Sequence, residues 1–275
     1  MPELPEVESA RQVIEEHALQ REICDVDDTD TYECRPHDPG QIKDALIGLH
    51  FVAANRIGKQ MFVATAEPDG TPGATLGIHL GMSGRMLVGG PGGSDEVSGG
   101  DYIGSDGDAH QAVEKEEWYR FSVSFADGGR LRLLDKRRLG RVVLDPDLEA
   151  LGPDAETVDR EQFRSILGAS STAVKTRLMD QGALSGVGNL LADEILWQCA
   201  IDPRRRAEDL TSDEADEVRR AMRKAIRDAH AAGGVHHGEI IPHREDGAAC
   251  PRCGAEMASG KIGSRTSWWC SAEQS

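Results

Sequence analysis

The second and third residues of the chain, Pro2 and Glu3, combine a secondary amine with a carboxyl group. Because a small residue at position two permits removal of Met1, we expect Pro2 to carry the free α-amino group. Such a group has a pKa of about 8, against about 10.4 for a lysine side chain, so much more of it is neutral and nucleophilic at neutral pH. A helix that starts at Leu4-Pro5 would further disfavour the protonated amine. These residues predict covalent catalysis by an amine, and an ordinary proline-flanked helix start is the alternative.

Three cysteines near the C-terminus have the spacing of metal ligands. Cys250 and Cys253 form a C-x2-C pair, and Cys270 follows. Glu273 stands where a second C-x2-C pair would place a fourth cysteine. Structural zinc sites use four ligands, and carboxylates are among the groups that bind zinc. The pattern therefore indicates a Cys3Glu zinc site, or else a metal-free β-hairpin held together by packing of Trp268-Trp269.

A glycine-rich turn precedes a helix that we predict over residues 189–200. Gly186 and Gly188 would expose backbone N–H groups just before Asn189, the first residue of that helix. Backbone N–H groups at a helix N-terminus bind anions such as phosphate. The turn therefore predicts a phosphate site, and a well-capped helical hairpin is the alternative.

The net charge of −17 at pH 7 is opposite in sign to that of most DNA-binding proteins. The local field at a binding groove, and not the total charge, decides whether DNA binds. The charges of this chain are unevenly distributed, with basic clusters at 136–141, 204–206 and 219–227 and acidic clusters at 25–30, 94–108 and 208–217. The composition therefore does not exclude a nucleic-acid ligand.

The first half of the chain, which must position the amine, reads as one helix followed by strands. Apolar residues recur at helical spacing after Pro5, at Val7, Ala10, Ile14 and Ala18. Alternation predicts a strand over 57–63 and a β-hairpin over 121–133, and several such strands imply a β-sandwich or a barrel-like domain. The stretch 89–109 is rich in Gly, Ser and Asp, which predicts a flexible surface insertion.

The second half reads as helical. A linker rich in Pro and Asp at 145–153 predicts a domain boundary. Helical patterns follow it, at 159–167, 172–181, 189–200 and 211–230. A hairpin with the cysteines described above would end the chain.

Several motifs together resemble those of the formamidopyrimidine-DNA glycosylase/endonuclease VIII family, and they occur in the same order. They are the start Met1–Glu8, the heptapeptide Ile78–Gly84, the run Asp135–Gly140 and the dozen residues Leu178–Asn189. The resemblance spans nearly the whole chain and implies an α+β fold. An N-terminal β-sandwich domain with the N-terminal helix would occupy 1–145, a helix–two-turn–helix domain 152–235, and a degenerate zinc-finger β-hairpin 240–275.

The same resemblance implies a base-excision-repair DNA glycosylase that removes oxidised bases and also has AP lyase activity. The Pro2 amine would attack C1′ of the deoxyribose while Glu3 protonates the sugar oxygen. The resulting Schiff base would allow β-elimination and then δ-elimination, with Lys59 and Arg265 aiding proton and phosphate handling. On spacing alone, Lys59 also fits a snorkelling edge lysine, and Arg265 fits an ordinary turn residue.

Further residues would contact DNA if the resemblance holds. Met82 would fill the gap that an extruded nucleotide leaves, which offsets part of the cost of base flipping. Arg137 and Arg138 would lie at the unpaired base beside Leu139, which replaces an aromatic residue and cannot stack. A solvated basic turn is the alternative for this run. The remaining contacts, to phosphates, would come from Arg120, Lys175 and Asn189.

The implied partner is damaged DNA in double-stranded form, and the implied cofactor is structural Zn²⁺, with no organic cofactor. We expect a monomer. The preferred lesion stays open, because Met82 favours the formamidopyrimidine branch whereas the short segment 233–249 and Leu139 favour the endonuclease VIII branch. The absence of an apolar run of eighteen residues and of an N-terminal apolar segment predicts a cytoplasmic protein without a membrane span.

Two other functions compete with the enzyme. A protein that recognises damaged DNA without cutting it would need neither Pro2 nor Glu3 nor Lys59, so their joint presence argues against it. A purely structural use of the helix–two-turn–helix module would leave the first 140 or so residues unexplained.

Overall fold

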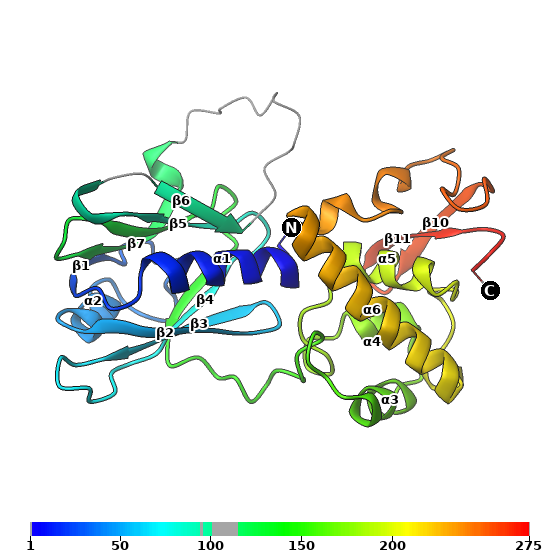
Figure 1. The fold of residues 1–275 in the computed structure, drawn as a ribbon, viewed down its shortest axis with the longest axis horizontal. Coiled ribbons are helices and arrows are strands. Elements are labelled where there is room, and N and C mark those ends of the chain that lie inside the picture. The colour runs from blue at the N-terminus through cyan, green and yellow to red at the C-terminus, as the bar shows by residue number, and fades with distance from the viewer. Residues whose placement is uncertain (1, 94–95, 101–114, 275) are drawn as a thin grey trace. The chain divides into compact units, whose positions relative to one another are not determined.

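The computed structural model describes residues 2–93, 96–100 and 115–274. The chain forms two compact units, one of Met1–Pro2 with Glu6–Leu148 and one of Glu3–Pro5 with Glu149–Ser275 (Figure 1). Among the described residues, no helix combines the length and apolar character that a membrane crossing would require.

Within the described part of the first unit, the strands form two antiparallel sheets, one of five strands and one of four. The five-stranded sheet has the order β1 (Ile23–Asp27), β7 (Tyr119–Phe125), β8 (Arg130–Leu134), β5 (Arg85–Gly89) and β6 (Glu96–Gly100). The four-stranded sheet has the order β2 (His50–Ile57), β3 (Gln60–Ala66), β4 (Leu76–His79) and β9 (Arg141–Leu144).

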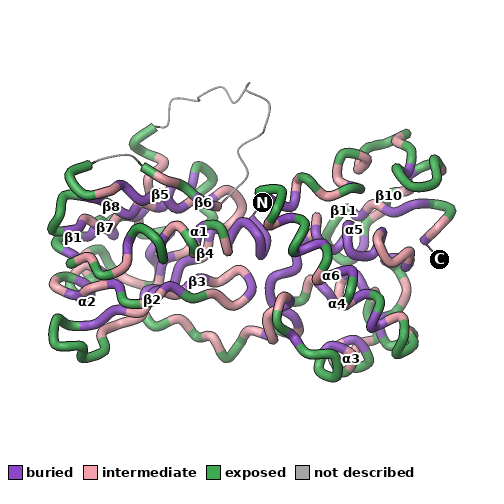
Figure 2. Tube along the Cα trace, viewed as in Figure 1, coloured by how far each residue is buried: buried purple, intermediate pink, exposed green. Residues whose placement is uncertain are grey.

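Both sheets share one apolar core with helices α1 (Leu4–His17) and α2 (Gln41–Leu46). The rings of Phe51 in β2 and Phe125 in β7 meet edge to face, with centroids 5.9 Å apart. The predicted apolar face is buried in this core, at Val7, Ala10 and Ile14 of α1 and at Ala18 just after it. Figure 2 shows buried and exposed stretches alternating along α1. Burying a side chain the size of valine or isoleucine contributes about 1.5 to 3 kcal/mol. The predicted sandwich with an N-terminal helix is confirmed.

The single strand predicted over 57–63 is wrong, because a tight turn interrupts it. Strand β2 ends at Ile57, β3 begins at Gln60, and Gly58 and Lys59 form the turn between them. Gly58 has a φ of 57°, a conformation that glycine adopts without a steric penalty. The alternating apolar pattern continues across the turn and hides it.

The prediction of a flexible insertion over 89–109 is also wrong in part. Residues Glu96–Gly100 are strand β6, which pairs with β5. A Cβ atom on Gly99 would lie 2.5 Å from the carbonyl oxygen of Ser9 in α1, so glycine permits a close approach there. The glycine content of 96–100 therefore reflects packing. Of the rest of the predicted insertion, Gly89 ends β5 and Pro91–Gly93 form a 3₁₀ turn, whereas 94–95 and 101–109 lie outside the described residues.

The second unit is helical and ends in a hairpin, as predicted. Its helices are α3 (Arg160–Gly168), α4 (Val174–Leu178), α5 (Asn189–Gln198) and α6 (Ser212–Ala232), and its strands are β10 (Met257–Ile262) and β11 (Arg265–Cys270). Helix α6 has a capping box between Thr211 and Glu214 at its N-terminus, and Gly233, whose φ is 85°, caps its C-terminus. Short 3₁₀ turns occur in both units. Those of the first unit are Pro91–Gly93 and Glu116–Trp118, and those of the second are Ala207–Asp209, Val235–His237 and Ile241–His243.

Candidate functional site

The carboxylate of Glu3 accepts three backbone hydrogen bonds at the start of α5. Gly188 N and Leu191 N donate to Oε2 at 2.9 and 3.1 Å, and Leu190 N donates to Oε1 at 2.8 Å. The side chain is fully buried. A carboxylate at a helix N-terminus satisfies N–H groups that lack partners within the helix. Glu3 therefore anchors the N-terminal segment to α5, and Pro2 is the residue directly before this anchor.

Glycine at position 188 is required by this contact. A Cβ atom there would lie 2.3 Å from Cδ of Glu3, well inside contact distance. The backbone of the neighbouring segment is tied down in the same way, because Leu4 N donates to the carbonyl oxygen of Gly186 at 3.2 Å. The N-terminal segment is thus fixed by main-chain groups on both sides of the glycine-rich turn.

The phosphate site predicted at residues 186–189 has a different occupant in the structure. The N–H groups that begin α5 already bind the carboxylate of Glu3. Asn189 is half-buried, and its Oδ1 atom has no hydrogen-bond donor within the described part of the chain. The phosphate contact of Asn189 stays a prediction, and the N–H groups of Gly188, Leu190 and Leu191 that bind Glu3 do not include that of Asn189.

Lys175 lies in a buried ion pair, which its sequence context does not reveal. Its side chain is 1% exposed, and Nζ lies 2.5 Å from Oδ1 of Asp193. The other oxygen of Asp193 accepts a hydrogen bond from Nε of Arg244 at 2.9 Å. Burial lowers the pKa of Lys175, and the attraction of Asp193 opposes that shift. The predicted phosphate contact of Lys175 stays a prediction, and the structure shows an internal role.

Lys59 is half-buried in the β2–β3 turn, near His79 at the end of β4. Burial, together with the positive charges of Lys59 and Arg141, lowers the pKa of His79 to about 4. Its Nδ1 atom can therefore accept the hydrogen bond that Gly81 N donates at 3.0 Å. Neutral His79 thus holds the start of the turn that carries Met82. Sequence reasoning gave His79 no role, although the heptapeptide at 78–84 includes it.

Asp135 connects the turn that contains Met82 to the basic loop 136–140. Ser83 Oγ donates to Oδ1 of Asp135 at 2.7 Å, and Leu139 N and Gly140 N each donate to Oδ2 at 2.7 Å. Met82 is half-buried, whereas Leu139 is 41% exposed. The two side chains predicted to fill space in DNA thus come from turns that share one carboxylate.

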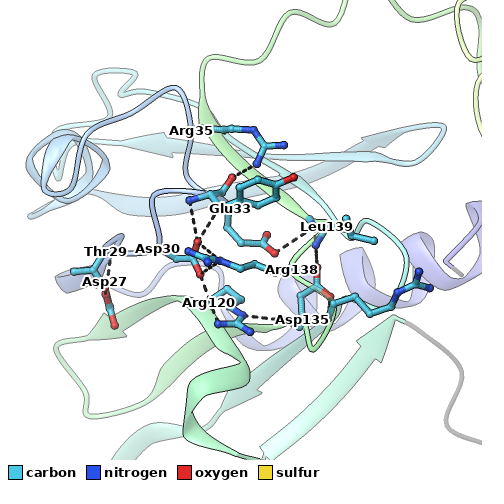
Figure 3. Close-up of polar contacts among 12 residues, drawn as sticks. Asp27, Thr29, Asp30, Glu33, Arg35, Arg120, Asp135, Arg138 and Leu139 are labelled. Carbon is cyan, nitrogen blue, oxygen red and sulfur yellow. Dashed lines mark hydrogen bonds and ion pairs between the residues drawn. The ribbon is translucent and has the colours of Figure 1, made fainter.

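The arginines predicted to contact DNA differ in their surroundings. Arg138, with a φ of 57°, donates through Nε to both oxygens of Asp30, at 3.0 and 2.8 Å (Figure 3). Arg120 Nε donates to the carbonyl oxygen of Asp135 at 3.1 Å, and its Nη1 atom lies 3.8 Å from Asp30. Arg137 is exposed. The DNA contacts of all three stay predictions, and the exposed Arg137 is the best placed for one.

The residues of the C-terminal cysteine cluster converge on one point. The Sγ atoms of Cys250, Cys253 and Cys270 and a carboxylate oxygen of Glu273 all lie within 4.8 Å of one another. Four ligands at zinc-to-sulfur distances near 2.3 Å around a tetrahedral ion are about 3.8 Å apart. The four donors therefore fit a zinc ion. Arg265 is exposed beside the turn of the same hairpin, opposite Ile262.

The family models and the relatives that match this chain all describe the same family. A family model described as the formamidopyrimidine-DNA glycosylase N-terminal domain matches residues 1–142, and one described as the formamidopyrimidine-DNA glycosylase H2TH domain matches residues 150–238. A formamidopyrimidine-DNA glycosylase of Mycobacterium avium (strain 104) is 30% identical over 300 residues, which cover 98% of this chain and 97% of the relative. A second relative, from Desulforamulus reducens, is 29% identical over 299 residues, with 100% and 99% covered.

Solved structures show the same fold. A Lactococcus lactis formamidopyrimidine-DNA glycosylase, non-covalently bound to DNA with an AP site, is 25% identical. It superimposes with a TM-score of 0.78, over 99% of each chain. Another complex of the Lactococcus lactis protein with abasic-site DNA has a TM-score of 0.79 at 23% identity, with 99% of each chain covered.

Proposed function

The chain belongs to the formamidopyrimidine-DNA glycosylase family, and we propose that it excises oxidised bases from DNA and then cleaves the strand at the abasic site. It is an enzyme of base excision repair. Solved relatives are complexes with DNA that contains an abasic site and with DNA that contains carbocyclic 8-oxo-G. Support for catalysis in this chain comes from Glu3, which directly follows the proposed nucleophile Pro2. Its carboxylate is anchored by backbone N–H groups at the start of α5.

In the proposed reaction, the Pro2 nitrogen forms a bond to C1′ of the deoxyribose. The bond from C1′ to the base breaks, and the base leaves with the electron pair and with the proton that the Pro2 nitrogen loses. Glu3 protonates the ring oxygen, so the ring opens and an iminium links Pro2 to C1′. The iminium acidifies the C2′ hydrogen, and its loss expels the 3′ phosphate by β-elimination. A second elimination expels the 5′ phosphate, with Lys59 and Arg265 aiding proton and phosphate handling.

We assign the DNA contacts in the same way. Met82 and Leu139 would occupy the space that the extruded nucleotide leaves, and the carboxylate of Asp135 connects the turns that carry them. Arg137, exposed in the loop between Asp135 and Leu139, would contact the strand opposite the lesion. These side chains all belong to the first compact unit.

We also infer that Cys250, Cys253, Cys270 and Glu273 would hold Zn²⁺. The ion would act as a structural crosslink between the ends of the β10–β11 hairpin and would take no part in the eliminations. The alternative is a metal-free hairpin, whose packing includes buried Trp197, Ile240 and Met257 together with half-buried Trp268.

Trapping with borohydride tests the proposed chemistry directly. An abasic-site oligonucleotide should become covalently linked to the native protein, because borohydride reduces the iminium to a stable amine. Pro2→Gln, whose larger side chain blocks removal of Met1, should form no adduct and still bind the DNA. Met1 lies outside the described residues, so mass spectrometry of the intact chain must first establish the N-terminus of both proteins.

The competing function is that of a damage-recognition protein that binds DNA without cutting it. A native protein with a free Pro2 amine that binds abasic DNA and yet forms no adduct would establish this alternative. Family membership and the fold would be unaffected by that result.

A further inference from the structure

An aromatic side chain stands exposed beside the basic loop of the first unit. Tyr32 is 45% exposed, as much as any large hydrophobic residue in the described part of the chain. The guanidinium carbon of Arg35 lies 3.8 Å from the centroid of its ring, and that of Arg138 lies 5.6 Å away. Both distances are within the range of cation–π attraction. The ring is therefore held in place by two cations while nearly half of its surface stays open to solvent.

The segment that carries Tyr32 is fastened to the basic loop by hydrogen bonds and ion pairs. Asp30 Oδ1 accepts the backbone N–H of Tyr32 at 3.0 Å, and the same carboxylate binds Nε of Arg138. Val142 N donates to the carbonyl oxygen of Glu33 at 2.9 Å. Figure 3 shows Asp30 and Glu33 beside Arg138 and Leu139. One rigid surface therefore carries Tyr32 together with the loop.

On this surface the acidic side chains are buried or nearly so, and the basic side chains of the loop are exposed. The side chains of Glu33 and Asp135 are fully buried, and that of Asp30 is 10% exposed. The cations of the loop, in contrast, are exposed at Lys136, Arg137 and Arg138. In a chain with a net charge of −17, a local surface of exposed cations around an aromatic ring and an exposed leucine is complementary to nucleic acid.

An exposed tyrosine by itself is ordinary on a protein surface. The combination here is more specific, because flat aromatic rings and guanidinium planes are the groups on which unpaired bases stack. Leu139, the exposed apolar residue of the adjacent loop, fills space but has no π-face. Tyr32 therefore supplies the π-face that the loop lacks.

We propose that Tyr32 is a DNA-contacting residue, which packs against an unpaired base of the strand opposite the lesion while Leu139 fills the adjoining space. This inference rests on the proposed function, because it needs damaged DNA as the ligand. Arg35 and Arg138 position the ring, and Asp30 positions Arg138 and the Tyr32 backbone together.

Binding to duplex DNA with a non-cleavable abasic analogue tests the proposal. Tyr32→Ala should raise Kd about 5- to 150-fold, the range that loss of one stacked base implies. Tyr32→Phe should bind like the wild type. The slope of log Kd against log salt should stay unchanged in both variants, because no phosphate contact is removed. Ile47→Ala is the matched control, since Ile47 is 44% exposed in the same unit.

A second measurement uses the unmodified protein and so does not depend on how the variants fold. Duplexes that carry 5-iodouracil opposite the abasic analogue should crosslink to Tyr32 on irradiation, as located by mass spectrometry. Crosslinks confined to other residues, or Tyr32→Ala binding as tightly as the wild type, would overturn the proposal. If the wild-type protein is trapped on abasic DNA by borohydride and either of these results is still obtained, only the role of Tyr32 is refuted. Absence of the borohydride adduct instead refutes the proposed catalysis.

Discussion

The carboxyl groups of Glu33 and Asp135 accept hydrogen bonds from one and the same backbone N–H group, that of Gly140, at 3.3 and 2.7 Å. Both side chains are fully buried. Two such groups cannot both be charged without a large cost, so they share a proton. Burial and the hydrogen bond with Asp135 raise the pKa of Glu33 to about 8. Burial also acts to raise the pKa of Asp135, but its hydrogen bonds, first that from Ser83, lower it overall.

The shared proton predicts a pH dependence of stability. The folded protein holds the proton of Glu33 more tightly than the unfolded chain, whose glutamates have a pKa near 4.5. The stability that this proton contributes is complete below about pH 4.5 and is lost as the pH rises through about 8. Between about pH 6 and pH 9, the free energy of unfolding of the wild type should fall by roughly 2 kcal/mol more than that of Glu33→Gln. Urea unfolding at both pH values measures this, with Glu67→Gln, an exposed glutamate, as the control. Parallel pH curves for the wild type and Glu33→Gln would refute the shared proton.

Gly188 should be intolerant of any side chain. The Cβ atom in Gly188→Ala would overlap Glu3, so the variant should lose about 1 to 3 kcal/mol of stability. Its yield of borohydride adduct should fall at least about tenfold, because displacement of a positioned group by even 1 Å has effects of that size or larger. Gly168→Ala, where no atom lies within 4 Å of the new Cβ, should keep both stability and adduct yield. Thermal unfolding and trapping of the two variants in parallel check this, and equal behaviour would show that the Glu3 anchor is dispensable.

Substitution of Lys175 distinguishes an internal role of its side chain from a DNA-binding role. Lys175→Met leaves Asp193 buried with Arg244 as its remaining cation, and loss of one partner of a buried ion pair costs about 3 to 5 kcal/mol. We expect a large loss of stability and an unchanged salt dependence of DNA binding. A stable variant whose salt slope falls by about one would instead support the phosphate contact predicted from the sequence.

Zinc content can be measured on the purified protein. We expect one zinc per chain by elemental analysis, with Cys253→Ser and Glu273→Ala losing the metal more readily in a chelator titration. Their zinc affinity should fall at least about tenfold, since loss of an outer-shell partner alone costs that much. Glu273→Cys should retain zinc, and Cys24→Ser, an exposed cysteine of the first unit, is the control. A folded wild-type protein without zinc would establish the metal-free hairpin.

The sequence predicts those features that depend on neighbours along the chain. Residues Val7 to Ala18 are buried at the predicted helical spacing, and the C-terminal cysteines do meet with Glu273. Contacts between distant segments have no local signal. The pairs Glu3–Gly188 and Asp30–Arg138 are 185 and 108 residues apart, so neither the cap of α5 nor the support of the basic loop could be predicted.

Glycine is a poor indicator of local structure in this chain, in both directions. Gly58 marks a turn that an alternating pattern concealed, and Gly99 belongs to a strand although its surroundings look like a flexible insertion. In both cases the reason is steric: a positive φ at Gly58 and the close approach of α1 at Gly99. Composition alone does not separate these uses of glycine from flexibility.

The main-chain hydrogen bonds to Glu3 have an evolutionary consequence. Its three donors are main-chain amides, which every amino acid except proline provides. Leu190 and Leu191 bind Glu3 without using their side chains, so any restriction on these side chains comes from the apolar core against which both pack. Descendants of this protein would inherit the contact through the path of the backbone, and Gly188 is the one position of the three at which the contact itself excludes a side chain.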